Sequence, residues 1–85
     1  MTKTITSNGH EALFTLLAKA RKDANLTQHE VAKRLRCHQS LIARIESGQR
    51  RIDVVEFIVI CRALEVEPTE IMSAVKAVTP LEQGL

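Results

Sequence analysis

The sequence is poor in aromatic residues, with two Phe and no Tyr or Trp among 85 residues. Proteins that bind RNA or single-stranded DNA stack the bases on aromatic side chains, so this composition argues against such a platform. Leu, Ile, Val and Ala must build the core, which suits helices packed on helices. Because 45% of the residues are hydrophobic, we expect one globular domain.

Features of membrane proteins, enzymes and metalloproteins are also missing. The longest apolar run, Phe57–Cys61, has five residues, too few to span a membrane. There are three glycines, no phosphate-binding glycine loop and no Ser/His/Asp spacing, which argues against catalysis. The two cysteines, Cys37 and Cys61, lack metal-ligand spacing, and no secretory signal precedes them. We therefore expect reduced thiols in a cytoplasmic protein without metal or cofactor.

Charge is distributed unevenly along the chain, although the formal net charge is only +2. Residues 10–51 include nine basic and four acidic side chains, whereas residues 52–85 include two basic and six acidic ones. The first segment is therefore suited to meet a polyanion, and the second is not.

Capping and turn signals predict five helices, at about 8–24, 27–35, 39–47, 53–64 and 68–77. Three residue pairs have the spacing of a capping box: Asn8 with Glu11, Thr27 with Glu30, and Asp53 with Glu56. Gly48 is expected to end the third helix and Pro68 to begin the fifth. The prediction is an all-α, compact five-helix bundle at 8–78, with a flexible N-terminal arm at 1–7 and a C-terminal tail at 79–85.

Two short helices joined by a tight turn, within residues 27–48, carry the most information about function. The second of them places Gln39, Ser40 and Arg44 on one face. Ile42 and Ile45 lie on the opposite, inward face. Reading the major groove of DNA requires such a helix, because Gln can pair with adenine and Arg with guanine.

These residues resemble the Cro/repressor-type helix-turn-helix family, also called the XRE family. The resemblance is carried by Leu26–Ala32, Ser40–Gly48 and Arg50–Asp53, and it extends over about residues 13–72. It implies a lambda-repressor-like fold in which the second and third helices form the helix-turn-helix. It also implies a sequence-specific regulator of transcription, typically a repressor, that binds double-stranded DNA as a homodimer on a palindromic operator.

The resemblance also assigns roles by position. Base contacts are expected from Gln39, Ser40 and Arg44, and contacts with the DNA backbone from Gln28, Arg36, Arg50 and Arg51. Gln28 would also brace Gln39, the first residue of the recognition helix. Arg21 and Glu46 match a pair that forms a structural salt bridge in the family.

Four residues depart from the family pattern. Arg36 occupies a turn position that usually holds Gly, so a left-handed backbone there would cost about 1 kcal/mol, which a phosphate contact would offset. Glu65 replaces the usual Gly before the last helix. His38 replaces a capping Ser or Thr, which weakens that cap. Leu41 replaces a small polar residue, and it would either touch a thymine methyl group or pack on a neighbouring side chain.

The fourth helix indicates a partner surface. Its inward stripe is expected to comprise Val54, Phe57, Ile58, Cys61 and Leu64. Val55 and Val59 lie outside this stripe, and with Ile71 and Val75 of the last helix they are expected to form a two-fold dimer interface. The alternative is extra core beneath the C-terminal tail.

Several biological roles share this architecture. The chain could be a free-standing repressor, the controller protein of a restriction–modification system, or an antitoxin whose apolar strip binds a toxin. A further alternative is a protein-interaction module that has lost DNA binding. An enzyme or a membrane protein is not expected.

Overall fold

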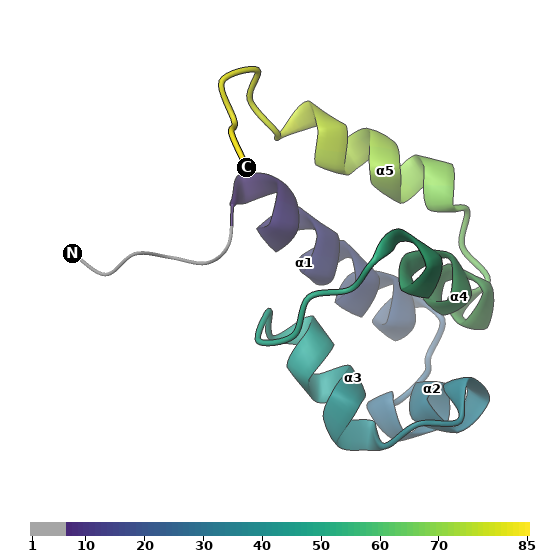
Figure 1. Cartoon of the computed structure of the whole chain (residues 1–85). Coiled ribbons are helices and arrows are strands. Elements are labelled where there is room, and N and C mark those ends of the chain that lie inside the picture. The colour runs from purple at the N-terminus through teal and green to yellow at the C-terminus, as the bar shows by residue number, and fades with distance from the viewer. Residues whose placement is uncertain (1–6) are drawn as a thin grey trace.

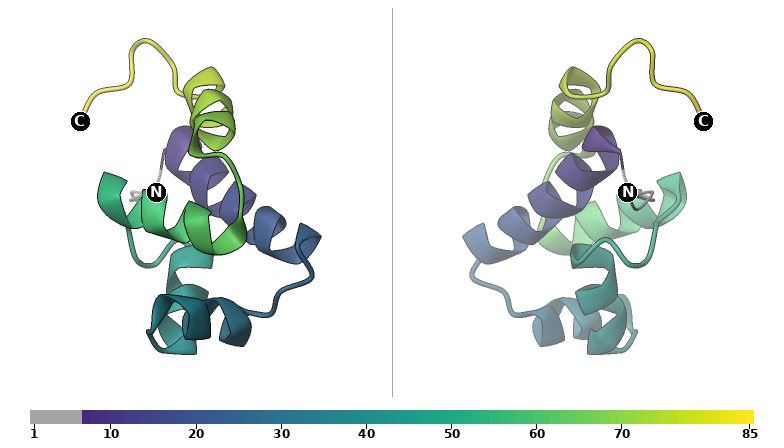
Figure 2. Two further views of the ribbon diagram at one scale, coloured as in Figure 1. Left: turned by 90° about the vertical axis from the view of Figure 1, so that its right-hand side faces the viewer. Right: turned by 90° about the vertical axis from the view of Figure 1, so that its left-hand side faces the viewer.

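The computed structural model describes residues 7–85, and within them it contains five helices and no strand. They are α1 (Asn8–Asp23), α2 (Gln28–Leu35), α3 (Gln39–Glu46), α4 (Val54–Leu64) and α5 (Pro68–Ala77). α2 and α3 lie at one end of the molecule and α5 at the other, with α1 and α4 between them (Figures 1 and 2). The predicted all-α bundle is confirmed. No helix in this described part is long and apolar enough to cross a bilayer.

Local sequence fixes the start of α2 and α4 as predicted. Thr27 accepts a hydrogen bond from the backbone N–H of Glu30, and the Glu30 carboxylate accepts one from the backbone N–H of Thr27. Asp53 and Glu56 form the same reciprocal pair at the start of α4. Both capping boxes satisfy backbone donors that a helix start leaves unpaired.

The start of α1 differs from the prediction by one residue. The N-cap is Ser7, whose hydroxyl accepts from the backbone N–H of His10 at 3.2 Å, and Asn8 is already helical. The proposed capping box of Asn8 with Glu11 is therefore wrong. Ser and Asn are about equally good N-cap residues, so residue preference alone could not show which of these two neighbours precedes the helix. Residues 1–6 of the predicted arm lie outside the described residues.

An apolar core joins all five helices. Its buried members are Leu17, Val31, Ala32, Ile42, Ile45, Phe57, Ile60, Cys61, Leu64 and Ile71. The stripe predicted for α4 needs two corrections: Val54 is 67% exposed, and Ile60 is buried. Val54 shares the helical period of Phe57, but it lies in the first turn of α4, where a hollow of about 110 Å³ remains between α4 and α5. Ile60 completes the buried face of the later turns.

Residues with a positive φ angle follow the ends of several helices. Asn25, Arg36 and Glu65 have φ of 59°, 57° and 58°, and Gly48 has φ of 84°. A Cβ atom on Gly48 would lie 2.6 Å from the ring of Phe14, so this position requires glycine. Arg36 adopts the left-handed conformation considered for it, and Glu65, which also replaces a family Gly, adopts it too.

Replacing Glu65 with Gly is expected to stabilise the fold by about 1 kcal/mol, because it relieves the left-handed conformation of a residue with a side chain. The ion pair that would be lost, with 3.7 Å between Arg34 Nη1 and Glu65 Oε2, is exposed and contributes little. The melting temperature should rise by roughly 4–8 °C. Glu67→Gly, at a residue with φ of −76°, is the control and should give no such rise. An equal or lower melting temperature for Glu65→Gly would contradict this account.

Candidate nucleic-acid interface

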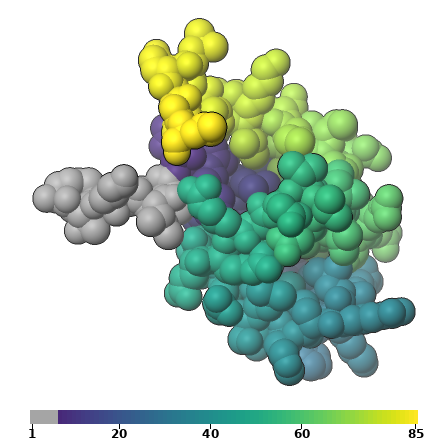
Figure 3. All heavy atoms as spheres, in the orientation of Figure 1, coloured from purple at the N-terminus to yellow at the C-terminus, as the bar shows by residue number. Residues whose placement is uncertain are grey.

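α2 and α3 pack against each other and are joined by a short turn. The three residues between them make a tight turn in which Arg36 takes the left-handed conformation and the N–H of Cys37 donates to the Ala32 carbonyl at 3.0 Å. His38, the N-cap of α3, makes no side-chain cap bond within the described residues, which agrees with the weaker cap expected for a residue that replaces Ser or Thr. Buried Val31 and Ile42 belong to the common core. In Figure 3 the blue and teal atoms of α2 and α3 form the lower end of the molecule.

The outer face of α3 carries the residues predicted to contact bases. Gln39, Ser40 and Arg44 are all exposed, whereas Ile42 and Ile45 on the opposite face are buried. α3 therefore presents two polar side chains and one guanidinium from a helix anchored on the core by its other face.

Leu41 does not belong to this polar face. It is half-buried and packs against the core, where it lines a groove between α3 and α4. Of the two roles considered for Leu41, packing on a neighbour is the one that the structure supports.

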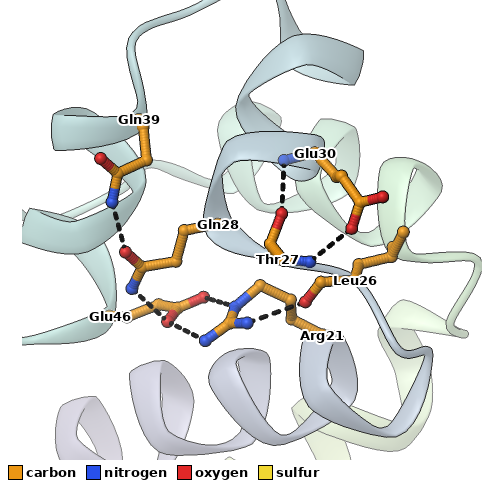
Figure 4. Close-up of polar contacts among 7 residues, drawn as sticks. All are labelled: Arg21, Leu26, Thr27, Gln28, Glu30, Gln39 and Glu46. Carbon is orange, nitrogen blue, oxygen red and sulfur yellow. Dashed lines mark hydrogen bonds and ion pairs between the residues drawn. The ribbon is translucent and has the colours of Figure 1, made fainter.

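A chain of hydrogen bonds links the start of α3 to α1 (Figure 4). Arg21 donates from Nε and Nη2 to the two carboxylate oxygens of Glu46, at 2.7 and 3.0 Å, and from Nη1 to the Leu26 carbonyl at 2.8 Å. Gln28 Nε2 donates to Glu46 at 2.9 Å, and Gln39 Nε2 donates to Gln28 Oε1 at 2.6 Å. The expected ion pair of Arg21 with Glu46 and the bracing of Gln39 by Gln28 are both present.

The ion pair within this chain is well shielded. The side chains of Arg21 and Glu46 are each 12% exposed. The hydrogen bond with Glu46 raises the pKa of Arg21 above its usual value. Two bonds to one carboxylate give the pair a fixed geometry, so the pair fixes the position of α3 relative to α1.

The basic loop before α4 contains two arginines with different surroundings. Arg50 donates to both carboxylate oxygens of Glu56, at 3.0 and 3.1 Å, and to the backbone carbonyl of Arg51 at 2.8 Å. The hydrogen bonds between these two side chains raise the pKa of Arg50 and lower the pKa of Glu56. Arg51 is exposed on the same loop. Sequence reasoning treated the two arginines alike and missed this ion pair, although Glu56 was already recognised as part of a capping box.

The residues predicted for a dimer interface fall into two groups. Val55 and Val59 are 71% and 45% exposed, and they border the groove between α3 and α4, which has a volume of about 190 Å³. Ile71 is buried in the core, and Val75 is half-buried against it. Ile71 is therefore not available as a surface residue, because α5 packs on α1 and α4 and turns this side chain inward.

The two short helices α2 and α3, the turn between them and the polar outer face of α3 define a helix-turn-helix protein. A helix-turn-helix family model matches residues 17–71, which is more than half of the chain. The chain belongs to the XRE-type helix-turn-helix family of DNA-binding transcription regulators.

Solved structures agree with this assignment. The chain is 40% identical to an XRE-family like protein from Pseudomonas syringae pv. tomato, with a TM-score of 0.77 over 85% of this chain and 88% of that one. The restriction–modification controller protein C.AhdI from Aeromonas hydrophila is 26% identical, with a TM-score of 0.67 over 73% and 94%. The controller protein C.Esp1396I, solved as a tetramer with its 35-base-pair operator, shares the fold at 19% identity, with a TM-score of 0.74 over 85% and 95%. The comparison with curated proteins gave no match.

Proposed function

We propose that the protein represses transcription by binding a palindromic operator as a homodimer, with α3 in the major groove of each half-site. The observation that carries this proposal is the outer face of α3, where Gln39, Ser40 and Arg44 project from a helix with a buried apolar back. These side chains can read bases, because an amide matches adenine and a guanidinium matches guanine. The packing of the buried face of α3 on the core fixes the position of these three side chains.

Contacts with phosphates would supply much of the affinity. Arg36 and Arg51 are exposed at the turn before α3 and on the loop after it, where backbone contacts are expected. Arg50 acts mainly by holding this loop on the start of α4 through Glu56. Gln28 is half-buried at the start of α2, where a phosphate can approach the helix N-terminus. Binding should therefore weaken steeply as salt rises.

The dimer interface is proposed to form along α4. Val55, Val59 and Arg62 are four and three residues apart, so they lie on one face of the helix, and all three are exposed. Antiparallel pairing of two α4 helices about a two-fold axis would bring the valines of the two protomers together.

This interface also suits the spacing of half-sites. Two recognition helices on adjacent half-sites lie about 34–36 Å apart, so each is about 17 Å from the two-fold axis. An interface on α4, which shares a groove with α3, would place the recognition helix of each protomer close to the two-fold axis.

A controller protein of a restriction–modification system is one candidate among the roles that share this fold. C.AhdI, which is such a protein, is similar to the chain over 94% of its own length. An antitoxin that uses the Val55 and Val59 surface for a toxin is the alternative, and purification with or without a bound partner protein separates the two.

Arg44→Ala is expected to reduce discrimination at one base pair of each half-site by about 1–3 kcal/mol, because a bidentate contact with one base is lost. Binding of operator variants, each changed at one base pair, measures this effect. Arg51→Ala is the matched comparison: it should weaken all sequences alike and flatten the salt dependence. A uniform loss for Arg44→Ala, or a changed base preference for Arg51→Ala, would contradict the assigned roles.

A further inference from the structure

The hydrogen-bond chain in Figure 4 has a direction that chemistry imposes on it. A carboxylate has only acceptor oxygens, and a guanidinium has only donors. Glu46 accepts from Arg21 on one side, and on the other side it can only accept from Gln28. The Gln28 amide must therefore turn its Nε2 toward Glu46, and its Oε1 is left to face Gln39.

The same logic fixes the amide of Gln39. Because Gln28 offers Oε1, Gln39 must donate to it from Nε2, as the 2.6 Å bond shows. Gln39 is then left with its own Oε1 and one N–H, that is, one acceptor and one donor. Gln39 is exposed at the start of α3, so these two groups are the ones that it can offer to a base.

We propose that Glu46 is a specificity-determining positioning residue, which sets through Gln28 the donor and acceptor pattern that Gln39 presents to DNA. The inference rests on the proposed function, because it requires Gln39 to contact a base edge. In the major groove, adenine offers an acceptor at N7 and a donor at N6, which complement one donor and one acceptor. Guanine offers two acceptors, N7 and O6, which this pattern does not match.

Reversing the direction of the hydrogen bonds through Gln28 would reverse the preference of Gln39 for adenine over guanine. If Gln28 turned its Nε2 toward Gln39, Gln39 would have to accept with Oε1, and both of its remaining N–H groups would face the DNA. Two donors complement guanine. An amide at position 46 permits this reversal, because it can accept from Arg21 Nε and donate to Gln28 Oε1. The Arg21–Glu46 pair thus does more than join α1 to α3: its acid sets which purine Gln39 favours.

The test compares the affinity of the full chain for operator duplexes that differ only in adenine or guanine at the position read by Gln39. That position is the one whose base preference is lost in Gln39→Ala. Glu46→Gln should lower the ratio of adenine to guanine affinity by about fivefold or more, which is the lower end of discrimination by a bidentate contact. Gln28→Ala removes the hydrogen bonds that link Glu46 to Gln39 but leaves the Arg21–Glu46 ion pair intact, so it should lower the same ratio.

Arg21→Lys is the matched control. It weakens the same ion pair but leaves Glu46 as an acceptor, so the melting temperature should fall while the purine ratio stays unchanged. The proposal is overturned if Glu46→Gln and Gln28→Ala keep the wild-type ratio, or if Arg21→Lys lowers it equally. If the wild-type protein shows no base preference that Gln39→Ala removes, the assignment of Gln39 in the proposed function fails, and the positioning role of Glu46 fails with it.

Discussion

Val59→Glu is expected to separate the protomers and to reduce operator affinity by roughly 10²- to 10⁴-fold, because each recognition helix would then bind its half-site without the second one linked to it. The reason lies in the surroundings of Val59. It borders an apolar groove with Val55 and Leu41, and in the proposed dimer the partner covers this surface. A carboxylate at that point opposes association because it must lose its hydration in the interface, which costs several kcal/mol, and Arg62 on the same face compensates only in part.

Sedimentation of the purified protein measures the first effect, and titration of an operator duplex measures the second. Met72→Glu on α5 is the matched control, because Met72 is 48% exposed and Val59 is 45% exposed, and Met72 lies outside the proposed interface. It should leave association unchanged. A Val59→Glu protein that remains dimeric would place the interface elsewhere, and a Met72→Glu protein that dissociates would extend it to α5.

Arg21→Ala is expected to destabilise the fold by about 3 kcal/mol or more, because it leaves the shielded carboxylate of Glu46 without its cation. It also removes the donor to the Leu26 carbonyl. For a domain of this size the melting temperature should fall by roughly 12 °C or more, which thermal unfolding followed by circular dichroism measures.

Lys19→Ala provides the comparison on the same helix. Lys19 and Asp23 form an ion pair with 2.7 Å between Nζ and Oδ2, but their side chains are 67% and 65% exposed. Solvent screens such a pair, so its loss should hardly change the melting temperature. If the two variants lost similar stability, the Arg21–Glu46 pair would not have the structural weight assigned to it.

Features encoded by neighbouring residues could be predicted from the sequence. The capping boxes at Thr27 and Asp53, the glycine at position 48 and the proline that begins α5 each depend on a few consecutive residues, and the structure contains all of them. The placement of Gln39, Ser40 and Arg44 on one exposed face also follows from helical periodicity alone.

Features that depend on packing between distant segments could not be predicted in this way. Ile71 has the same chemistry as an exposed interface residue, and only the packing of α5 on α1 and α4 makes it part of the core. The ion pair of Arg50 with Glu56 depends on the turn of the loop before α4, which the residue pattern did not indicate. The bond between Gln28 and Glu46 joins residues 18 positions apart, and no local pattern indicates it.

Selection of bound duplexes from a random pool, at near-physiological salt, tests the central claim most directly. The wild-type protein should enrich a pseudo-palindrome whose half-sites lie about one helical turn apart, with centres about 34–36 Å from each other. If the folded protein enriched no sequence, it would not be a sequence-specific operator-binding regulator, and the outer face of α3 would have to serve contacts with another protein.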